Sequence, residues 1–395
     1  MSTAKNIYLA GAVRTPIGRY GGALAGLTAA ELGAIVARES LERAGVEPGE
    51  VQEVVWGCAR QAGGGPNVGR QIAYRAGVPE TVPASTINQA CGSGLKAIIL
   101  AAEQIMLGRA RAVLAGGVES MSRVPYFAEG VRFGLRMGDA ELVDGMHRDG
   151  FADPLSGLLM GQTAENLARE YEISRDEQDA YALRSQQEAK RAQGQGVFAE
   201  EIVPVEVKTR KGLKVVDTDD HLRPETTLEV LAKLPTAFSK DGFVTAGNAS
   251  GIVDGAAALV IAGEDYVKEK SLTPAGRIVS WAYAGVEPEF MGIGPVPAIR
   301  KALEKANLKL EEIDLVEVNE AFACQYLAVE KELGLDRSKT NVNGGAIALG
   351  HPLGASGTRL VLTALNELRR RGGRYGLASA CIGGGQGIAI IFERA

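Results

Sequence analysis

The sequence is poor in several kinds of residue and pattern, and each scarcity excludes a class of protein. It has only three histidines and four cysteines in 395 residues, and no CxxC pair. A framework of disulfides or a set of zinc ligands is therefore not expected. No uninterrupted apolar run approaches the ~18 residues of a transmembrane helix, and the first residues lack the long apolar region of a signal peptide. We expect a cytoplasmic protein with no membrane partner and no bound metal.

An excess of basic charge is also absent. Asp and Glu number 48 against 43 Lys and Arg, which gives a formal net charge of -5. Nucleic-acid binders depend on a basic footprint, so no nucleic-acid partner is expected. The sequence has no GxxxxGK[ST], no GxGxxG after a strand, no HExxH and no GxSxG. The sequence therefore has none of the usual motifs for nucleotide hydrolysis, dinucleotide redox chemistry, zinc catalysis or serine esterase chemistry.

Glycine, by contrast, is abundant. The 51 glycines are about twice the usual share of ~7%, without the period of collagen. Such an excess belongs in turns, tight packing sites or backbone that faces a ligand. The composition, 46% hydrophobic and 23% charged, is that of a globular protein whose length exceeds what one core usually serves. Two or more structural units are expected.

One supersecondary unit occurs twice in the chain. Residues 34–57 and 297–319 both read as an amphipathic helix, a short polar loop and an apolar strand. At a constant offset, Arg38, Leu41, Glu42, Ala44, Glu50 and Val54 match Arg300, Leu303, Glu304, Ala306, Glu312 and Val316. Further on, the strand from Ala112 matches the strand from Tyr375. Strands that alternate with helices predict an α/β protein with a mostly parallel sheet.

The first copy carries a large insertion, which divides the chain into three parts. We expect an N-terminal half of residues 1–121 and 250–272, an inserted loop domain of residues 122–249, and a C-terminal half of residues 273–395. Within the insertion, the capping box Ser174-x-x-Glu177 opens a strong helix signal. The basic stretch VKTRKGLK is either a solvated hairpin or a loop that faces a phosphate.

Cys91 is a candidate nucleophile. It follows the strand-like STINQ and opens CGSG, ahead of the helical segment LKAIILAAEQIMLG. A sulfur at a helix N-terminus meets unpaired N–H groups, which favour the thiolate over a thiol whose free pKa is ~8.5. A small buried cysteine beside a packing turn stays open as the alternative.

A nucleophilic cysteine usually needs a base, and His351 is the histidine placed to supply it. It lies in NGGAIALGHPLGASG, the counterpart in the second copy of the loop around Cys91. Two halves related by a pseudo-twofold axis would bring these loops together over one cleft. His147 and His221 lie in polar surroundings inside the insertion, and we expect both at the surface.

Two more residues belong to the candidate site. Cys381 enters IGGGQG, where consecutive glycines free backbone N–H groups to bind an anion. Asn319, in VEVNEAF, ends a strand, where its amide could orient a water or donate to an oxyanion; a turn-forming Asn is the alternative. Cys58 and Cys324 lack such loops and read as buried apolar cysteines. A Cys, a His and a second Cys in glycine-rich loops suit acyl transfer through a thioester.

These motifs resemble those of the thiolases over nearly the whole chain. They are VRTPIG, NQACGSGLKA, GGVESMS, MGQTAENLA, SRDEQDAYALRSQ, TAGNASGIVDGAAA, VEVNEAFA, NVNGGAIALGHPLGASG and CIGGGQG. The sequence is most similar to the degradative 3-ketoacyl-CoA thiolases, although acetyl-CoA acetyltransferases share the catalytic motifs. The resemblance implies the thiolase fold, an α/β fold of two pseudo-symmetric halves layered αβαβα, with a loop-domain insertion in the first half.

The resemblance also implies a role for each motif residue. Cys91 would take the acyl group, His351 would activate its thiol, and Cys381 would move the proton at the α-carbon of acetyl-CoA. Asn319 would hold a water that, with His351, stabilises the enolate oxygen. The backbone N–H groups of Cys91 and Gly383 would form a second oxyanion hole. The implied reaction is reversible CoA-dependent cleavage of 3-ketoacyl-CoA to acetyl-CoA and a shortened acyl-CoA, and the reverse Claisen condensation.

Coenzyme A and acyl-CoA are implied as substrates, with no permanently bound cofactor. Positions along the adenine and pantetheine path are Arg223, Thr226, Leu234, Phe238, Ala246 and Ser250, and positions at the acyl end are Met160 and Phe322. Leu159 stands where biosynthetic thiolases commonly have His, which predicts a more apolar site that tolerates longer acyl chains. The substrate stays open between acetoacetyl-CoA and longer 3-ketoacyl-CoA.

Two rival readings and an assembly follow from the same motifs. A ketoacyl synthase or a hydroxymethylglutaryl-CoA synthase shares the repeat and the nucleophile, but the Cys381 and VNEAF pattern disfavours both. A non-catalytic, thiolase-like lipid carrier is the other alternative. It is disfavoured because a carrier does not require Cys91, His351 and Cys381 together. Thiolases form dimers that pair again, so a homotetramer is expected, with the insertion near the contact between dimers.

Overall fold

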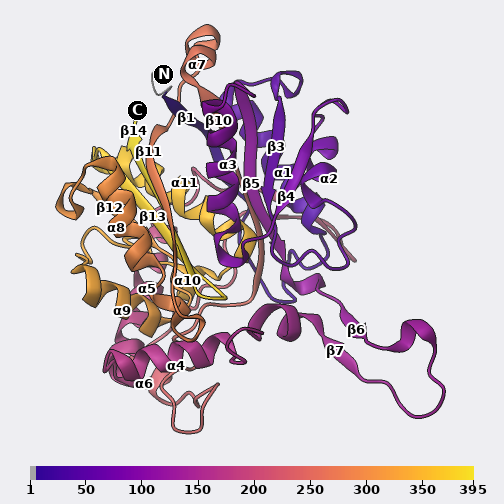
Figure 1. The fold of residues 1–395 in the computed structure, drawn as a ribbon, viewed down its shortest axis with the longest axis vertical. Coiled ribbons are helices and arrows are strands. Elements are labelled where there is room, and N and C mark those ends of the chain that lie inside the picture. Colours follow the sequence, from indigo (N-terminus) through magenta and orange to yellow (C-terminus); the bar gives the residue numbers. More distant parts are fainter. Residues whose placement is uncertain (1–5) are drawn as a thin grey trace.

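A ten-stranded sheet runs through the molecule, of which the computed structural model describes residues 6–395 (Figure 1). The strand order is β12-β13-β14-β11-β1-β10-β5-β3-β4, with β2 paired to β10. The strands are β1 (Ile7–Arg14), β2 (Gly18–Arg19), β3 (Glu53–Gly57), β4 (Ala84–Ile87), β5 (Ala112–Ser120), β10 (Val253–Gly263), β11 (Gly276–Gly285), β12 (Leu315–Val318), β13 (Tyr375–Ile382) and β14 (Gln386–Arg394). The halves join where β1 and β11 pair, with Leu9 opposite Gly276. On either side of this join the orders β10-β5-β3 and β14-β13-β12 are equivalent, as the sequence repeat predicts.

The sheet is mixed, so the expectation of a mostly parallel sheet is wrong. Within residues 6–395 the parallel pairs are β3–β4, β3–β5 and β12–β13, whereas β1–β10, β5–β10, β11–β14 and β13–β14 are antiparallel. The turn between β13 and β14 is too short for a crossover helix, so these strands form a hairpin. Gly384 and Gly385 make this turn with φ of 84° and 82°, a conformation that glycine adopts most easily.

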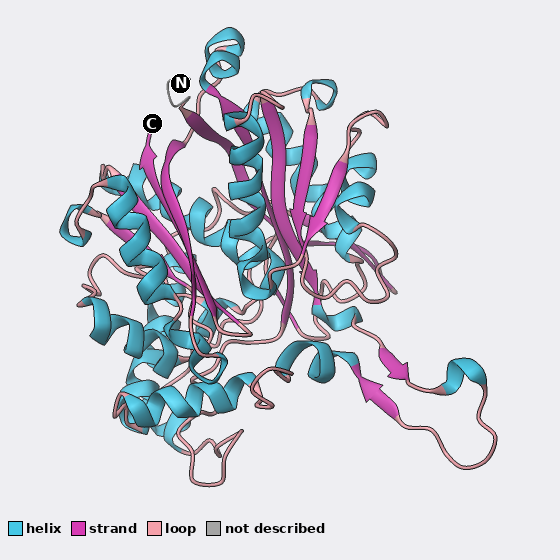
Figure 2. Ribbon diagram, viewed as in Figure 1, coloured by secondary structure: helices cyan, strands magenta, loops and turns pink. Residues whose placement is uncertain are grey.

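Helices form an outer layer on each half and a central layer between the halves (Figure 2). The outer helices are α1 (Ala29–Ala44), α2 (Val68–Arg75), α8 (Pro295–Ala306) and α9 (Ala323–Leu333); short α7 (Glu264–Lys270) follows β10. The central helices, α3 (Ser93–Met106) and α11 (Leu353–Arg371), pack against each other, and α11 contacts strands of both halves. The predicted αβαβα layering is therefore confirmed.

Glycine permits the close approach of the two central helices. A Cβ on Gly94 would lie 2.7 Å from the Gly354 carbonyl oxygen, and a Cβ on Gly357 would lie 2.4 Å from the Leu95 nitrogen. Because both helices begin in glycine-rich loops, this contact brings the loops of the two halves together. Part of the glycine excess is thereby explained.

The inserted segment packs against both halves and adds no described strand to the main sheet. Its elements are β6 (Tyr126–Ala128), β7 (Leu142–Asp144), α4 (Met160–Glu170), α5 (Arg175–Gly194), β8 (Val205–Thr209), β9 (Gly212–Val216) and α6 (Leu228–Ala232). The capping box that begins α5 is present: Ser174 N donates to Glu177 Oε2 at 2.7 Å, and Glu177 N donates to Ser174 Oγ at 3.2 Å. The basic stretch lies in the β8–β9 hairpin and is largely exposed, so it is the solvated hairpin.

Buried charges join the insertion to the N-terminal half. The guanidinium of Arg14, at the end of β1, donates to Glu201 at 2.7 Å and to both carboxylate oxygens of Asp219 at 2.7 and 2.9 Å. All three side chains are buried. Thr363 of α11 donates to the same Glu201 carboxylate at 3.2 Å. This cluster therefore connects β1, the insertion and a central helix.

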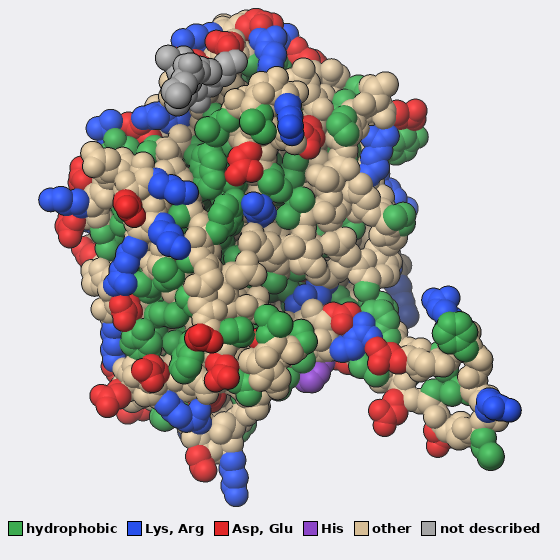
Figure 3. Space-filling view, viewed as in Figure 1, with side chains coloured by type: hydrophobic (Ala, Val, Ile, Leu, Met, Phe, Trp, Pro, Cys, Tyr) green, Lys and Arg blue, Asp and Glu red, His purple; other side chains and the backbone are tan. Residues whose placement is uncertain are grey.

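The β6–β7 hairpin and the loop between its strands, residues 126–144, form an arm that extends away from the body of the molecule (Figure 1). Separate hydrophobic side chains project from its end, between charged and polar groups (Figure 3). The most exposed are Phe133 at 95% and Met137 at 94%, and Leu142 is 69% exposed. The arm therefore exposes several large apolar side chains to solvent.

Candidate active site

Cys91 lies in a single 3-10 turn, Ala90–Gly92, directly before α3, so its predicted place at a helix N-terminus is confirmed. The preceding Ala90 has a φ of 43°, and such strained backbone is concentrated at functional sites. The expected lowering of the thiol pKa is wrong. Burial raises the pKa of Cys91 and outweighs the opposing effects of the Arg60 charge and of the backbone N–H groups of Gly383 and Cys91. Cys91 is therefore a thiol that needs a base.

His351 is buried and held at both ring nitrogens. Its Nδ1 lies 2.6 Å from the Ser356 hydroxyl, and that hydroxyl donates to the Pro352 carbonyl at 3.1 Å. Because the Ser356 proton is used in this way, its oxygen accepts from Nδ1–H. The Nε2 atom then carries the lone pair and accepts from the Asn319 amide at 3.3 Å. This tautomer is the one that can take a proton at Nε2.

The surroundings keep His351 neutral. Burial, assisted by the positive charges of Arg359 and Arg60, lowers its pKa to about 3. At pH 7 the imidazole is therefore uncharged and free to act as a base. A cation formed on it during reaction gains from the hydrogen bond to Ser356, since hydrogen bonds to charged groups are the stronger ones.

Sequence analysis missed the role of Ser356, although a signal for it exists. Ser356 occupies the place in the second copy that Ser93 occupies in the first. The Ser93 hydroxyl donates to the Ala90 carbonyl at 2.7 Å, just as Ser356 donates to Pro352. In the N-terminal half this hydrogen bond closes the turn around Cys91. In the C-terminal half the serine hydroxyl also accepts a hydrogen bond from His351 Nδ1.

Asn319 and Cys381 lie on neighbouring strands of the C-terminal half. Asn319 follows β12, and its backbone N–H donates to the Ser379 carbonyl at 2.9 Å. Its side-chain Oδ1 is buried and has no hydrogen-bond partner among residues 6–395. Cys381 is fully buried; burial and then the neighbouring Cys91 raise its pKa. Cys381 is therefore a thiol that can donate a proton, and the Asn319 amide keeps a free acceptor.

A pocket brings together four of the six positions expected along the CoA path. It is lined by Gln186, His221, Arg223, Thr226, Val230, Leu231, Leu234, Ala246, Gly247 and Ile347. Phe238 and Ser250 are not among the lining residues. Phe238 instead meets Phe322 edge to face, with ring centroids 6.2 Å apart, and Ser250 N donates to the Ala321 carbonyl at 3.0 Å. These two positions thus lie beside the acyl-end residue Phe322.

Met160 and Gly383 are also close to each other. A Cβ on Gly383 would lie 3.1 Å from the Met160 sulfur. Met160 is the first residue of α4, and Leu159 is its N-cap. The inserted segment therefore reaches the glycine-rich loop that faces Cys91.

The expectation of a surface His221 is wrong. Its Nδ1 lies 2.9 Å from the Ala348 carbonyl in the short helix α10 (Ala346–Leu349), and its Nε2 lies against Gly251. Burial lowers its pKa. The surrounding sequence is polar, but the fold packs it against the turn that leads to His351. His147 is exposed, as expected.

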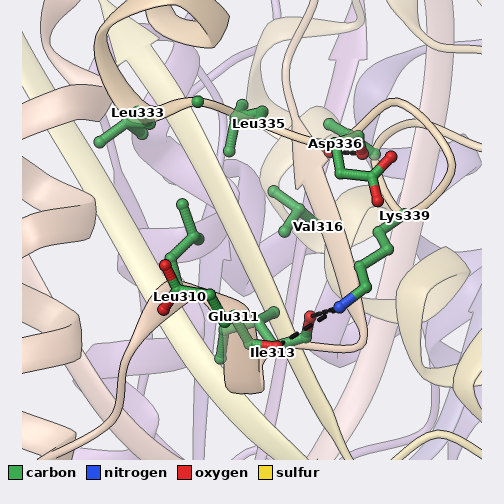
Figure 4. A pocket seen from close by; sticks show the side chains of 10 residues that line it. Leu310, Glu311, Ile313, Val316, Leu333, Leu335, Asp336 and Lys339 are labelled. Atoms are coloured by element: carbon green, nitrogen blue, oxygen red, sulfur yellow. Dashed lines mark hydrogen bonds between the residues drawn. The ribbon is translucent and has the colours of Figure 1, made fainter.

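A second pocket lies at the edge of the sheet, away from these residues (Figure 4). It is lined by Leu310, Glu311, Ile313, Val316, Leu333, Gly334, Leu335, Asp336, Lys339 and Thr340. Lys339 donates to the Glu311 and Ile313 carbonyls at 3.4 and 3.3 Å. None of the predicted site residues lines it.

Comparisons with known proteins identify the family. The sequence profile of the thiolase N-terminal domain matches residues 7–265, and that of the thiolase C-terminal domain matches residues 272–394. The chain belongs to the thiolase family. The acetyl-CoA acetyltransferase of Cupriavidus necator is 52% identical to this thiolase over 98% of this chain and 99% of its own. The human mitochondrial 3-ketoacyl-CoA thiolase is 51% identical over 100% and 99% of the two chains.

Solved structures agree with this assignment. The crystal structure of human mitochondrial 3-ketoacyl-CoA thiolase has a TM-score of 0.97 and 50% identity to this thiolase, and covers all of both chains. The acetyl-CoA acetyltransferase of Bacillus anthracis gives 0.98 and 49%, again over all of both chains. A complex of the human enzyme with CoA gives 0.96 and covers 100% of this chain and 99% of its own. The thiolase fold expected from the sequence is therefore confirmed.

Within residues 6–395 no helix combines the length and apolar character needed to cross a membrane. The same part of the chain holds no group of His, Cys, Asp and Glu arranged to bind a metal ion.

Proposed function

We propose that this thiolase cleaves 3-ketoacyl-CoA with CoA, and runs the reverse Claisen condensation, through an acyl group on Cys91. The observation that carries the proposal is the chain of contacts from Ser356 through a neutral His351 to Asn319. The thiols of Cys91 and Cys381 are neighbours, and Cys91 faces the backbone N–H of Gly383, which supports the same assignment.

In the degradative direction, His351 Nε2 takes the proton of Cys91, and the thiolate adds to the C3 carbonyl. The N–H groups of Cys91 and Gly383 receive the negative oxygen of the tetrahedral intermediate. The C2–C3 bond then breaks, and the electron pair passes to the enolate of acetyl-CoA. A water on Asn319, together with His351, stabilises this enolate oxygen, and Cys381 gives its proton to C2.

In the second half of the reaction, the thiol of CoA attacks the acyl group on Cys91. By then His351 has passed the proton of Cys91 to the Cys381 thiolate, so it can take the CoA thiol proton and give it to the Cys91 thiolate as the shortened acyl-CoA leaves. CoA enters along the pocket that contains Arg223, Thr226 and Leu234, and binds only as a substrate. Catalysis requires interactions that strengthen in the transition state. Negative charge develops on one oxygen during acyl transfer and on another during carbon–carbon bond cleavage, so each of the two steps has its own oxyanion site.

Incubation with acetyl-CoA followed by peptide mass spectrometry tests the proposal. The acetyl group is expected on the peptide that contains Cys91; absence of this label refutes the mechanism. In Cys381→Ala the Cys91 peptide should still be acetylated, while condensation and cleavage are lost, because the second thiol serves only carbon–carbon chemistry. A non-catalytic lipid carrier would show neither label nor cleavage of acetoacetyl-CoA, and a ketoacyl-synthase-like enzyme would not lose condensation with Cys381.

The chain-length preference forms a finer part of the proposal. Leu159 caps α4 beside Met160 and presents an apolar side chain at a place where biosynthetic thiolases commonly have His. We propose that the pocket accepts acyl chains longer than that of acetoacetyl-CoA. Rates measured across a series of 3-ketoacyl chain lengths test this, and confinement to the four-carbon substrate refutes it.

The assembly and the organisation of the chain are also proposals. The apolar end of the arm, with Phe133 and Met137 exposed, supports a homotetramer in which the arms join two dimers. Phe133→Ser with Met137→Ser should reduce the mass measured by light scattering to that of a dimer. We also propose that the chain is divided into residues 1–121 with 250–272, residues 122–249 and residues 273–395. We propose a cytoplasmic location, which cell fractionation tests.

A further inference from the structure

Glu320 is a buried carboxylate near the reacting groups that the proposed mechanism does not use. It lies in the short segment between β12 and α9 and is fully buried. Its Oε1 accepts from the Tyr181 hydroxyl at 2.8 Å and from the Asn341 amide at 3.2 Å. Its Oε2 accepts from the Ser185 hydroxyl at 2.7 Å and from Ile347 N at 3.1 Å. A buried carboxyl group with four donors is held firmly in one place.

The four donors come from three separate segments of the chain. Tyr181 and Ser185 are four residues apart on α5, so both lie on the same face of that helix. Burial and then Glu320 raise the pKa of Tyr181, so its hydroxyl keeps the proton that it donates. Asn341 lies in the loop after α9, and Ile347 lies in α10. Glu320 therefore joins the inserted segment to two segments of the C-terminal half.

The backbone around Glu320 leaves room for its carboxyl group. A Cβ on Gly345 would lie 2.3 Å from the Glu320 carboxyl carbon and 2.6 Å from each oxygen. Gly345 N also donates to Ser185 Oγ at 3.1 Å, and this hydroxyl donates in turn to Glu320. The Asn341 side chain binds both Val318 N and the Val318 carbonyl at 2.9 Å. The segment between α9 and α10 is therefore fixed to Glu320 and to β12.

Glu320 also connects the two segments that carry Asn319 and His351. It follows Asn319 in the chain, and it binds the backbone of Ile347, four residues before His351. The Asn319 amide and His351 Nε2 are 3.3 Å apart, which is long for a hydrogen bond, so a small shift of either segment breaks this contact. Ser356 holds the histidine ring at Nδ1, on the side away from Asn319.

We propose that Glu320 is a positioning residue that sets the spacing between Asn319 and His351, and that it serves the carbon–carbon step rather than acyl transfer. This inference rests on the proposed function, in which a water on Asn319 and the His351 ring stabilise the enolate oxygen together. Such a site loses its effect when its donors move apart. Acyl transfer needs only the His351 base, which Ser356 orients, and the N–H groups that face the Cys91 sulfur.

Tyr181→Phe tests the proposal, because it removes one donor to Glu320 and keeps the carboxyl group. Two single-turnover rates are measured in the full-length enzyme: acetylation of Cys91 by acetyl-CoA, and condensation of the acetylated enzyme with a second acetyl-CoA. We expect condensation to slow about tenfold and acetylation to change by less than about twofold, because only condensation needs Asn319 and His351 together.

Tyr326→Phe is the matched control. The Tyr326 ring stacks on the Tyr181 ring, with centroids 4.1 Å apart and 17° between the planes, but its buried hydroxyl makes no hydrogen bond to Glu320. Both rates should equal those of the wild type. Glu320→Gln is the stronger variant, because its amide group faces hydroxyl and N–H donors where an acceptor stood, and condensation should slow about a hundredfold. Thermal unfolding establishes that each variant is folded.

Other outcomes overturn the inference in distinguishable ways. A condensation rate in Tyr181→Phe equal to that in Tyr326→Phe, or an equal loss of both rates, shows that Glu320 does not act on the carbon–carbon step. A higher KM for CoA with both rates unchanged assigns the carboxylate to the CoA pocket, which Ile347 lines. If wild-type enzyme takes no acetyl label on Cys91 and does not cleave acetoacetyl-CoA, the proposed function itself fails.

Discussion

Replacing Ser356 with alanine should slow acylation of Cys91 while leaving the fold intact. The change removes the acceptor of His351 Nδ1–H, which lies 2.6 Å from the hydroxyl in a buried site. The Nδ1–H is then unpaired, and the ring can adopt the other tautomer, with the proton on Nε2 where Cys91 needs a base. An unpaired buried donor costs about 2 kcal/mol, which corresponds to about thirtyfold in rate.

The measurement is single-turnover acetylation of Cys91 by acetyl-CoA, followed by rapid quench and mass spectrometry at pH 7. Ser280→Ala is the matched control. The Ser280 hydroxyl is also buried and donates to a carbonyl, that of Ala302, at 2.7 Å, but it lies in β11 and touches no site residue. Thermal unfolding of both variants establishes that both are folded.

The reasoning is refuted if Ser356→Ala acylates Cys91 as fast as Ser280→Ala does. The same holds if the loss appears only in the KM for acetyl-CoA, because orientation of the base acts on the chemical step. A loss in rate with an unchanged KM supports the role of Ser356 as a positioning residue for His351.

Three further predictions concern pH, charge and packing. The folded-state pKa of His351, about 3, lies below the unfolded value of about 6.5, so the unfolded chain binds more protons between these pH values. In denaturant titrations the wild type should therefore lose stability relative to His351→Gln as pH falls from 7 towards 4. A difference in unfolding free energy that does not depend on pH contradicts this. Arg14→Met leaves two buried carboxylates unpaired and should lower the urea-unfolding free energy by about 3–5 kcal/mol. The matched control Arg374→Met removes an exposed ion pair and should leave that free energy nearly unchanged; equal effects argue against the buried cluster. A Cβ on Gly117 would lie 1.8 Å from the carbonyl oxygen of the first turn of α11, so Gly117→Ala should cost about 1–3 kcal/mol and slow acylation of Cys91. Gly26→Ala, which meets no atom within 4 Å, is its control, and a comparable loss there would count against the packing argument.

The internal repeat and the local elements of secondary structure could be predicted from the sequence, because they depend on neighbouring residues along the chain. The capping box at Ser174 and the strand from Ala112 follow from side-chain spacing alone. The equivalence of the two halves predicted that the loops of Cys91 and His351 meet, since equivalent segments of a pseudo-twofold structure lie at equivalent places. The roles assigned to these residues remain predictions that the acylation experiments test.

Other features could not be read from the chain, because they depend on segments far apart in sequence. The direction of β10 against β5 made the sheet mixed, although each strand looked the same from its residues. His221 is polar in its local sequence but is packed against α10. The contact of the Arg60 guanidinium with Gly150 of the inserted segment could not be predicted either.

The sequence by itself determined the family, the two halves and which few residues carry the chemistry. The tertiary structure decided the state of those residues. Burial raised the pKa of Cys91 against the pull of the helix end, and lowered that of His351 until it became a neutral base. The physical reason is that motif and periodicity depend on covalent neighbours, whereas the free energy of a charge depends on the solvent that distant segments exclude.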